Sequence, residues 1–236
     1  MLTIEELGYE ETELGELTLR RRSEPRLGGE IVYEVKLGDE YLMSSLFTEA
    51  ERQLAVLGLA GLSGNLDVVV GGLGLGYTAA EALADERVKQ LLVIDLFQAV
   101  IDWHQRELMP MSGSLVNDPR CELRQADFFE LAKAGFDAAA PRRKFDAVLL
   151  DIDHSPEHWL AAENESFYTE AGLGSLREQL KRDGSFALWS NDPGSEGFTE
   201  LLRRVFGEAR FEDVEFSNPY TGATSVNSVY VAVSTR

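Results

Sequence analysis

The sequence predicts an α/β protein with a doubly wound, mostly parallel sheet, a terminal antiparallel hairpin and a small β meander before the sheet. Short apolar runs of the β type alternate with segments of helical character, which is typical of a parallel sheet covered on both faces. These runs are residues 68–70, 91–94, 147–150 and 185–189. Two later runs, residues 211–216 and 226–233, flank the turn-rich segment 218–222, so we expect them to form the closing hairpin.

The first part of the chain has the pattern of a meander. Apolar and polar side chains alternate in short runs, which are residues 17–20, 31–35 and 41–43. Glycines separate these runs, so we expect a small antiparallel first domain over residues 1–47. Thr48 followed three residues later by Glu51 is a helix-start signature, which predicts a helix over about 48–60. Residues 48–236 then form the second domain, which carries the parallel sheet.

The charge of the chain restricts its partners. Its 236 residues include 22 Lys and Arg against 41 Asp and Glu, a formal net charge of −19 at pH 7. Such a chain repels phosphate at long range, which argues against a nucleic-acid partner. It attracts small cations, although acidity can also serve solubility alone. Hydrophobic residues make up 44% of the chain, enough for a substantial core, so a disordered protein is excluded.

The single cysteine, Cys121, excludes an internal disulfide, and no cysteine cluster indicates a zinc site. The glutamate-rich first sixteen residues are the opposite of a signal peptide, and no apolar run approaches the roughly 20 residues that cross a bilayer. We therefore expect a soluble cytoplasmic protein with no membrane partner.

The sharpest local signal is a glycine-rich turn between a strand and a helix. Gly72, Gly74 and Gly76 follow the run at 68–70 and precede a helix-forming segment. Glycines allow a positive φ and let a ligand approach the backbone closely. A dinucleotide fingerprint needs its third glycine where this chain has Tyr77, so NAD and FAD are disfavoured. The spacing is the one familiar from S-adenosylmethionine-type nucleoside sites, and the alternative is a tight turn with no ligand.

Two acidic residues at later strand ends extend this nucleoside hypothesis. Asp95 follows the second apolar run, nineteen residues after the last glycine, where a carboxylate can accept both ribose hydroxyls. It could equally cap a helix. Asp127 ends another short extended run and, in such folds, faces the adenine with an apolar neighbour against the ring. We take Leu96 and Phe128, the residues directly after these two, as further nucleoside contacts.

The candidate catalytic residues follow a third predicted strand. The apolar run at 147–150 places Asp151 in the crevice where open α/β sheets bind ligands, and Asp153 and His154 come directly after it. Two carboxylates and an imidazole suit a cationic amine or a proton-accepting role. The alternative for Asp153 is that it only caps a turn.

The order of these motifs resembles the spermidine synthases, the polyamine aminopropyltransferases, which have the Rossmann-like class I methyltransferase fold. The resemblance covers roughly residues 14–236. It implies that Gly72, Gly74 and Gly76 form the nucleoside turn, that Asp95 and Asp127 bind the ribose and the adenine side, and that Asp151 is catalytic. It also implies decarboxylated S-adenosylmethionine as cosubstrate, a cationic amine as acceptor, no metal and a homodimer. Asp153, His154 and Tyr168 are the candidate amine contacts.

Two departures from the family keep other functions open. Leu75 stands where the family has an acidic residue that helps to hold the aminopropyl end, and the family's second acidic residue after Asp151 is shifted so that His154 takes its place. One alternative is methyl transfer from S-adenosylmethionine on the same fold. Another is a catalytically silent protein that binds a nucleoside or a polyamine.

Overall fold

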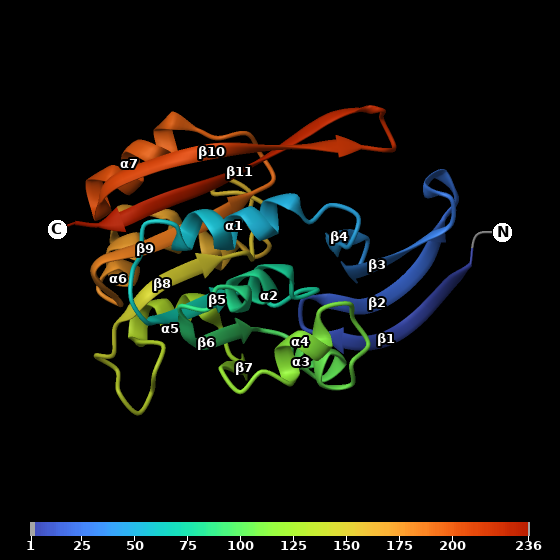
Figure 1. Ribbon diagram of the computed structural model, residues 1–236, viewed down its shortest axis with the longest axis horizontal. Helices are drawn as coiled ribbons and strands as arrows, with labels where there is room; N and C mark the ends of the chain where they lie inside the picture. The colour runs from blue at the N-terminus through green and yellow to red at the C-terminus, as the bar shows by residue number, and fades with distance from the viewer. Residues whose placement is uncertain (1–2, 236) are drawn as a thin grey trace.

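The N-terminal part of the protein is a four-stranded antiparallel sheet, separate from the main sheet. The computed structural model describes residues 3–235 (Figure 1). The sheet consists of β1 (Ile4–Thr12), β2 (Gly15–Glu24), β3 (Glu30–Leu37) and β4 (Glu40–Ser44), in that order. A short 3₁₀ helix, η1 (Pro25–Leu27), joins β2 to β3. The predicted meander is confirmed, and β1 is an additional strand at its edge.

The second sheet has seven strands in the order β10-β11-β9-β8-β5-β6-β7. These are β5 (Leu66–Gly71), β6 (Val88–Asp95), β7 (Cys121–Gln125), β8 (Phe145–Leu150), β9 (Leu180–Ser190), β10 (Gly207–Asn218) and β11 (Ala223–Ser234). Strands β5 to β9 pair in parallel, whereas β11 pairs antiparallel with both β9 and β10. The predicted α/β class, the mostly parallel sheet and the closing hairpin are therefore confirmed.

Helices cover both faces of this sheet. They are α1 (Glu49–Leu59), α2 (Tyr77–Ala84), α3 (Gln98–Gln105), α4 (Ser112–Val116), α5 (Phe128–Ala134), η2 (Ala162–Tyr168), α6 (Glu170–Arg177) and α7 (Glu196–Phe206). Successive side chains of a strand point to opposite faces. Val68 and Val70 accordingly join the core under α1 to α4, while Val69 joins the core under α5 to α7. This two-sided burial explains why the strands are apolar throughout.

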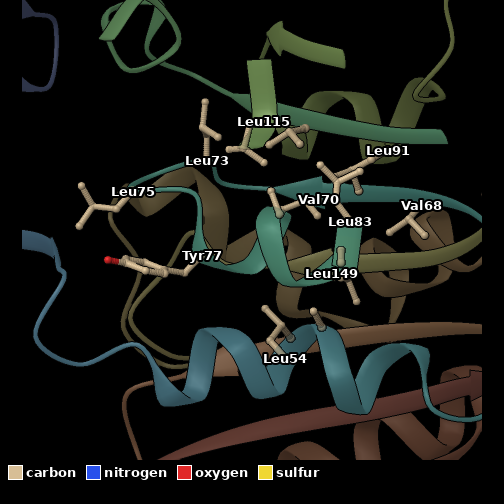
Figure 2. Close-up of a cluster of buried hydrophobic side chains, with 14 of the residues drawn as sticks. Leu54, Val68, Val70, Leu73, Leu75, Tyr77, Leu83, Leu91, Leu115 and Leu149 are labelled. Atoms are coloured by element: carbon tan, nitrogen blue, oxygen red, sulfur yellow. The ribbon is translucent and has the colours of Figure 1, made fainter. Parts of the chain in front are cut away.

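The first of these cores supports the glycine turn. Figure 2 shows Leu54 of α1 facing the sheet next to Leu149, with Leu73 and Tyr77 on the segment that leads from β5 into α2.

The helix predicted from Thr48 is confirmed, although the Thr48 side chain makes no cap hydrogen bond. No helix in the described part of the chain is long and apolar enough to cross a membrane.

The hairpin of β10 and β11 reaches over to the N-terminal sheet, and its tip lies near η1 (Figure 1). The ring of Phe47 lies 5.3 Å from Phe216 and 6.3 Å from Tyr220, measured between centroids. Arg22 donates a hydrogen bond to the Tyr220 hydroxyl at 2.8 Å, and that hydroxyl donates to Glu24 at 2.8 Å. The tip is therefore fastened to the N-terminal sheet.

Candidate active site

A cavity of about 870 Å³ lies where the carboxyl ends of the parallel strands face the N-terminal sheet. The arrowheads of β6 and β8 in Figure 1 point towards β1–β4. One wall comes from the β1–β2 turn and from β3 and β4, and the other comes from the glycine turn and the ends of β6, β7 and β8. The end of β9 and the terminal hairpin complete the lining. The predicted strand-end residues Asp95, Asp127 and Asp151 thus line one cavity.

The glycine turn has the backbone conformation that its sequence predicts. Gly72, Gly74 and Gly76 have φ values of 93°, 46° and 90°, a region that other residues rarely adopt. Gly72 and Gly74 line the cavity, and a Cβ on Gly72 would lie 2.0 Å from the backbone oxygen of Asp151. Gly76 lies outside the lining and begins α2, where a Cβ would lie 2.7 Å from Leu115. The backbone conformation and the close packing therefore require glycine at these positions.

Asp95 organises the same turn. Its Oδ2 accepts a hydrogen bond from the backbone N–H of Leu73 at 2.9 Å, and its Oδ1 accepts from that of Phe97 at 2.9 Å. Burial raises the pKa of Asp95 despite these bonds. Both Asp95 and the exposed Leu96 line the cavity, at the end of β6.

Asp127 and Phe128 lie at the neighbouring strand end. Asp127 caps α5, because its Oδ1 accepts hydrogen bonds from the N–H groups of Phe129 at 2.8 Å and Glu130 at 3.2 Å. Phe128 is buried against Gly71, where a Cβ would lie 2.5 Å from the ring. Both Asp127 and Phe128 line the cavity.

A buried histidine also holds the glycine turn, and the sequence did not reveal this role. His104 of α3 is fully buried, and burial lowers its pKa to about 4. The ring is therefore neutral at pH 7, with Nε2 2.9 Å from the carbonyl oxygen of Gly74 and Nδ1 3.1 Å from the Ser112 hydroxyl. Nε2–H donates to the carbonyl and Nδ1 accepts from the hydroxyl. A lone histidine on a helix gives no sequence signal for such a contact.

The strand end of β8 carries a pair of carboxyl groups, Asp151 and Glu51. Asp151 lines the cavity, and its Oδ2 accepts a hydrogen bond from the Thr78 hydroxyl at 2.7 Å. Glu51 of α1 is 8% exposed and also lines the cavity, although the sequence indicated only a helix start there. Burial raises the pKa of Asp151 to about 6, and burial with the charge of Asp151 raises the pKa of Glu51 to about 8.

This pair predicts a pH-dependent stability. The folded protein retains protons on Glu51 and Asp151 that the unfolded chain loses near pH 4, so these groups destabilise the fold as pH rises towards 8. We expect Glu51→Gln to have a higher Tm than the parent at pH 8.5. This gain in Tm should be at least about 2 °C larger at pH 8.5 than at pH 5. Calorimetric scans measure this difference. The exposed Glu49→Gln is the control, and a pH-independent difference for Glu51→Gln would contradict the prediction.

The other candidate amine contacts have different surroundings. Asp153 is 1% exposed and accepts hydrogen bonds from the Leu160 N–H, the Asn164 amide and the Tyr168 hydroxyl, each at 2.8 Å. Asp153 and Tyr168 lie outside the cavity lining, where they shape the loop that follows β8. His154 does line the cavity, with Nε2 2.8 Å from Glu40 of β4. Of the three, only His154 is placed to meet a ligand directly.

The lining is strongly acidic. Its carboxyl groups belong to Glu10, Glu13, Glu51, Asp95, Asp127, Asp151 and Glu163. Within the described residues no Lys or Arg lines the cavity. Among residues 3–235 no group of three or more His, Cys, Asp and Glu side chains is arranged to hold a metal ion. The cavity therefore suits a cation with apolar parts.

The family model of the spermine/spermidine synthase domain matches residues 50–201, more than half of the chain. The chain belongs to the spermine/spermidine synthase family. The polyamine aminopropyltransferase of Pyrobaculum aerophilum is 27% identical over 148 residues, 62% of this chain and 49% of the relative. That of Prochlorococcus marinus is 28% identical over 149 residues, 60% and 48% of the two chains. This family member thus spans about half the length of the curated relatives it matches.

Solved structures of the spermine/spermidine synthase family share the fold. The spermidine synthase of Thermotoga maritima has a TM-score of 0.74 at 19% identity, covering 97% of this chain and 72% of that one. A spermidine synthase in complex with the transition-state analogue AdoDATO also has a TM-score of 0.74 at 19% identity, covering 97% and 73%. The likeness extends over nearly the whole chain, including the N-terminal sheet.

Proposed function

We propose that this protein transfers an aminopropyl group from decarboxylated S-adenosylmethionine to a cationic amine. The observation that carries the proposal is the acidic cavity, which joins a nucleoside-type glycine turn to the Glu51–Asp151 pair. Membership of the spermine/spermidine synthase family supports it, as does the structural neighbour bound to AdoDATO. The nucleoside would be held by Gly72, Gly74, Gly76, Asp95, Leu96, Asp127 and Phe128.

The charge of the lining favours the decarboxylated donor over S-adenosylmethionine itself. The donor's sulfonium and aminopropyl ammonium are both cations, which the carboxylates of the cavity stabilise. The carboxylate of S-adenosylmethionine would need a basic partner, and none of the described lining residues is Lys or Arg. Burying an unpaired carboxylate beside other carboxylates costs several kcal/mol. Methyl transfer from the carboxylated donor is therefore the weaker candidate.

The acceptor must lose a proton before it can attack. Alkyl amines have a pKa near ~10, so almost all of the amine is protonated at pH 7. Asp151 lies deep in the cavity, where Thr78 fixes its Oδ2. We assign it the orientation of the attacking nitrogen towards the methylene carbon beside the sulfonium. His154 lies nearer the N-terminal sheet, where it contacts the distal part of the amine.

The donor preference can be measured by calorimetric titration and by turnover with putrescine. We expect decarboxylated S-adenosylmethionine to bind at least tenfold more tightly than S-adenosylmethionine, a difference of about 1.4 kcal/mol. We also expect methylthioadenosine to appear as a product with putrescine. Tighter binding of the carboxylated donor with methylation of an amine would instead establish a methyltransferase. Binding with no turnover of any amine would establish a silent binding protein.

We retain three expectations from the sequence and the family resemblance as proposals. These are a homodimer, a cytoplasmic location and a domain boundary at residue 47. The N-terminal residues up to 44 form their own sheet, which supports the boundary. Light scattering on the purified protein tests the dimer.

A further inference from the structure

Glu51 has no assigned partner in the site just described. Its side chain is nine-tenths buried and lines the cavity beside Asp151. Within residues 3–235 no other residue donates a hydrogen bond to its carboxylate. The neighbouring Arg52 is directed elsewhere, bonding Glu81 at 3.0 Å and lying over the ring of Tyr77 at 5.1 Å. The hydrogen bond that this carboxyl group does receive comes from its own backbone N–H. A carboxyl group that lines a cavity and has no donor from another residue can accept further hydrogen bonds, which points to a ligand contact.

We propose that Glu51 is a catalytic residue that accepts the proton of the attacking amine, while Asp151 orients the nitrogen. This inference rests on the proposed aminopropyl transfer. The two carboxyl groups differ in their surroundings: Thr78 donates a hydrogen bond to Asp151, which favours its ionised form, whereas Glu51 receives no such bond from another residue. Glu51 is therefore the stronger base of the pair.

The charged and titratable groups around Glu51 agree with this assignment. They are Asp151 at the end of β8, Glu49 and Arg52 on α1 itself, and Tyr77 on α2. Two of these, Asp151 and Glu49, raise the pKa of Glu51, whereas the hydrogen bond from its own backbone N–H and the charge of Arg52 lower it. In the absence of ligand the pair therefore holds a proton near neutral pH. An entering ammonium ion replaces that proton, so amine binding releases a proton to the solvent.

The transfer step balances with Glu51 as the acceptor. Glu51 takes one proton from the substrate ammonium, and the nitrogen lone pair forms a bond to the methylene carbon beside the sulfonium. The C–S bond breaks and its electron pair stays on sulfur. The product leaves as a secondary ammonium ion with methylthioadenosine, and the proton now on Glu51 restores the protonated state that the pair has without ligand. One proton is released per turnover, and it is the proton that leaves when the amine binds.

The variant Glu51→Gln tests this role by kinetics. We expect kcat to fall about 100-fold, at the lower end of the range for a general base, while the KM for the donor changes less than threefold. In the parent, kcat/KM for the amine should rise with pH as Glu51 loses its proton. In Glu51→Gln this rise should disappear. Glu200→Gln, an equal charge change at an exposed position on α7 outside the lining, should stay within twofold of the parent. A kcat for Glu51→Gln within threefold, with an unchanged pH profile, overturns the proposal.

A second measurement does not depend on turnover. Putrescine is titrated into protein saturated with methylthioadenosine, in two buffers of different ionisation enthalpy, which reports the protons released on binding. We expect about one proton for the parent and for Glu200→Gln, and none for Glu51→Gln. If the parent shows this release but transfers no aminopropyl group, Glu51 belongs to an amine site and the proposed reaction is wrong. Equal release by parent and Glu51→Gln, or no amine binding by the parent, overturns the role of Glu51.

Discussion

Replacing Gly72 with alanine is expected to lower the free energy of unfolding by at least about 3 kcal/mol and to abolish nucleoside binding. Alanine is strained at a φ of 93°. Its Cβ would also lie 2.0 Å from the backbone oxygen of Asp151 and 3.2 Å from the Ile152 side chain. The backbone cannot yield there, because the N–H of Asp151 is bonded to the carbonyl of Gly71 at 2.8 Å. Chemical denaturation and titration with methylthioadenosine measure the two effects.

Gly174→Ala is the matched control for this substitution. Gly174 lies within α6, and a Cβ there meets no atom within 4 Å. Alanine is the better helix former, so we expect this variant to be more stable than the parent by about 0.5–1 kcal/mol. Both variants add one methyl group in place of a hydrogen. Equal stabilities of the Gly72 and Gly174 variants would contradict the close approach of Gly72 to β8.

Replacing Asp151 with asparagine is expected to lower kcat for aminopropyl transfer about 10³-fold. The amide cannot attract the substrate ammonium, although it can still accept the Thr78 hydrogen bond seen at 2.7 Å. The proposed nucleoside contacts lie on other strand ends, so the affinity for methylthioadenosine should change less than threefold. Because asparagine removes a buried charge, the Tm at pH 8 should match or exceed that of the parent. Steady-state kinetics and calorimetry measure these quantities.

Asp146→Asn controls for the same chemical change on the same strand. Asp146 lies at the other end of β8, outside the cavity lining, and pairs with Lys181 at 2.7 Å. We expect its kcat to remain within twofold of the parent. An Asp151→Asn enzyme that also remained within threefold would show that Asp151 does not orient the amine.

The sequence predicted those strands whose side chains are buried on both faces of the sheet. Val68, Val69 and Val70 are buried on both sides of the sheet, so their strand was recognisable without context. The strand β1 was missed because both of its faces are largely exposed and rich in glutamate, and its pairing with β2 shifts register between Glu6 and Gly8. Edge strands of this kind have no apolar periodicity to detect.

The same contrast explains the site. Asp95, Asp127 and Asp151 could be named because parallel strands end at one edge of a sheet. Glu51 could not, because a glutamate near a helix start is common and its burial depends on the packing of α1 against α2 and the main sheet. The contacts of Asp153 were equally invisible, since they depend on the folded path of the loop up to Tyr168.

The fastening of the hairpin tip to the N-terminal sheet has a consequence for the order of assembly. Arg22 and Tyr220 are 198 residues apart, so their contact joins nearly the two extremes of the chain. During synthesis the glycine turn, Asp95 and Asp151 emerge well before β10 and β11. The cavity therefore remains open on the side of Phe216 and Asn227 until the last strands have paired. Closure over this long separation is slow compared with helix formation, so a nascent chain presents the glycine turn and the strand-end carboxyl groups before the last strands complete the cavity.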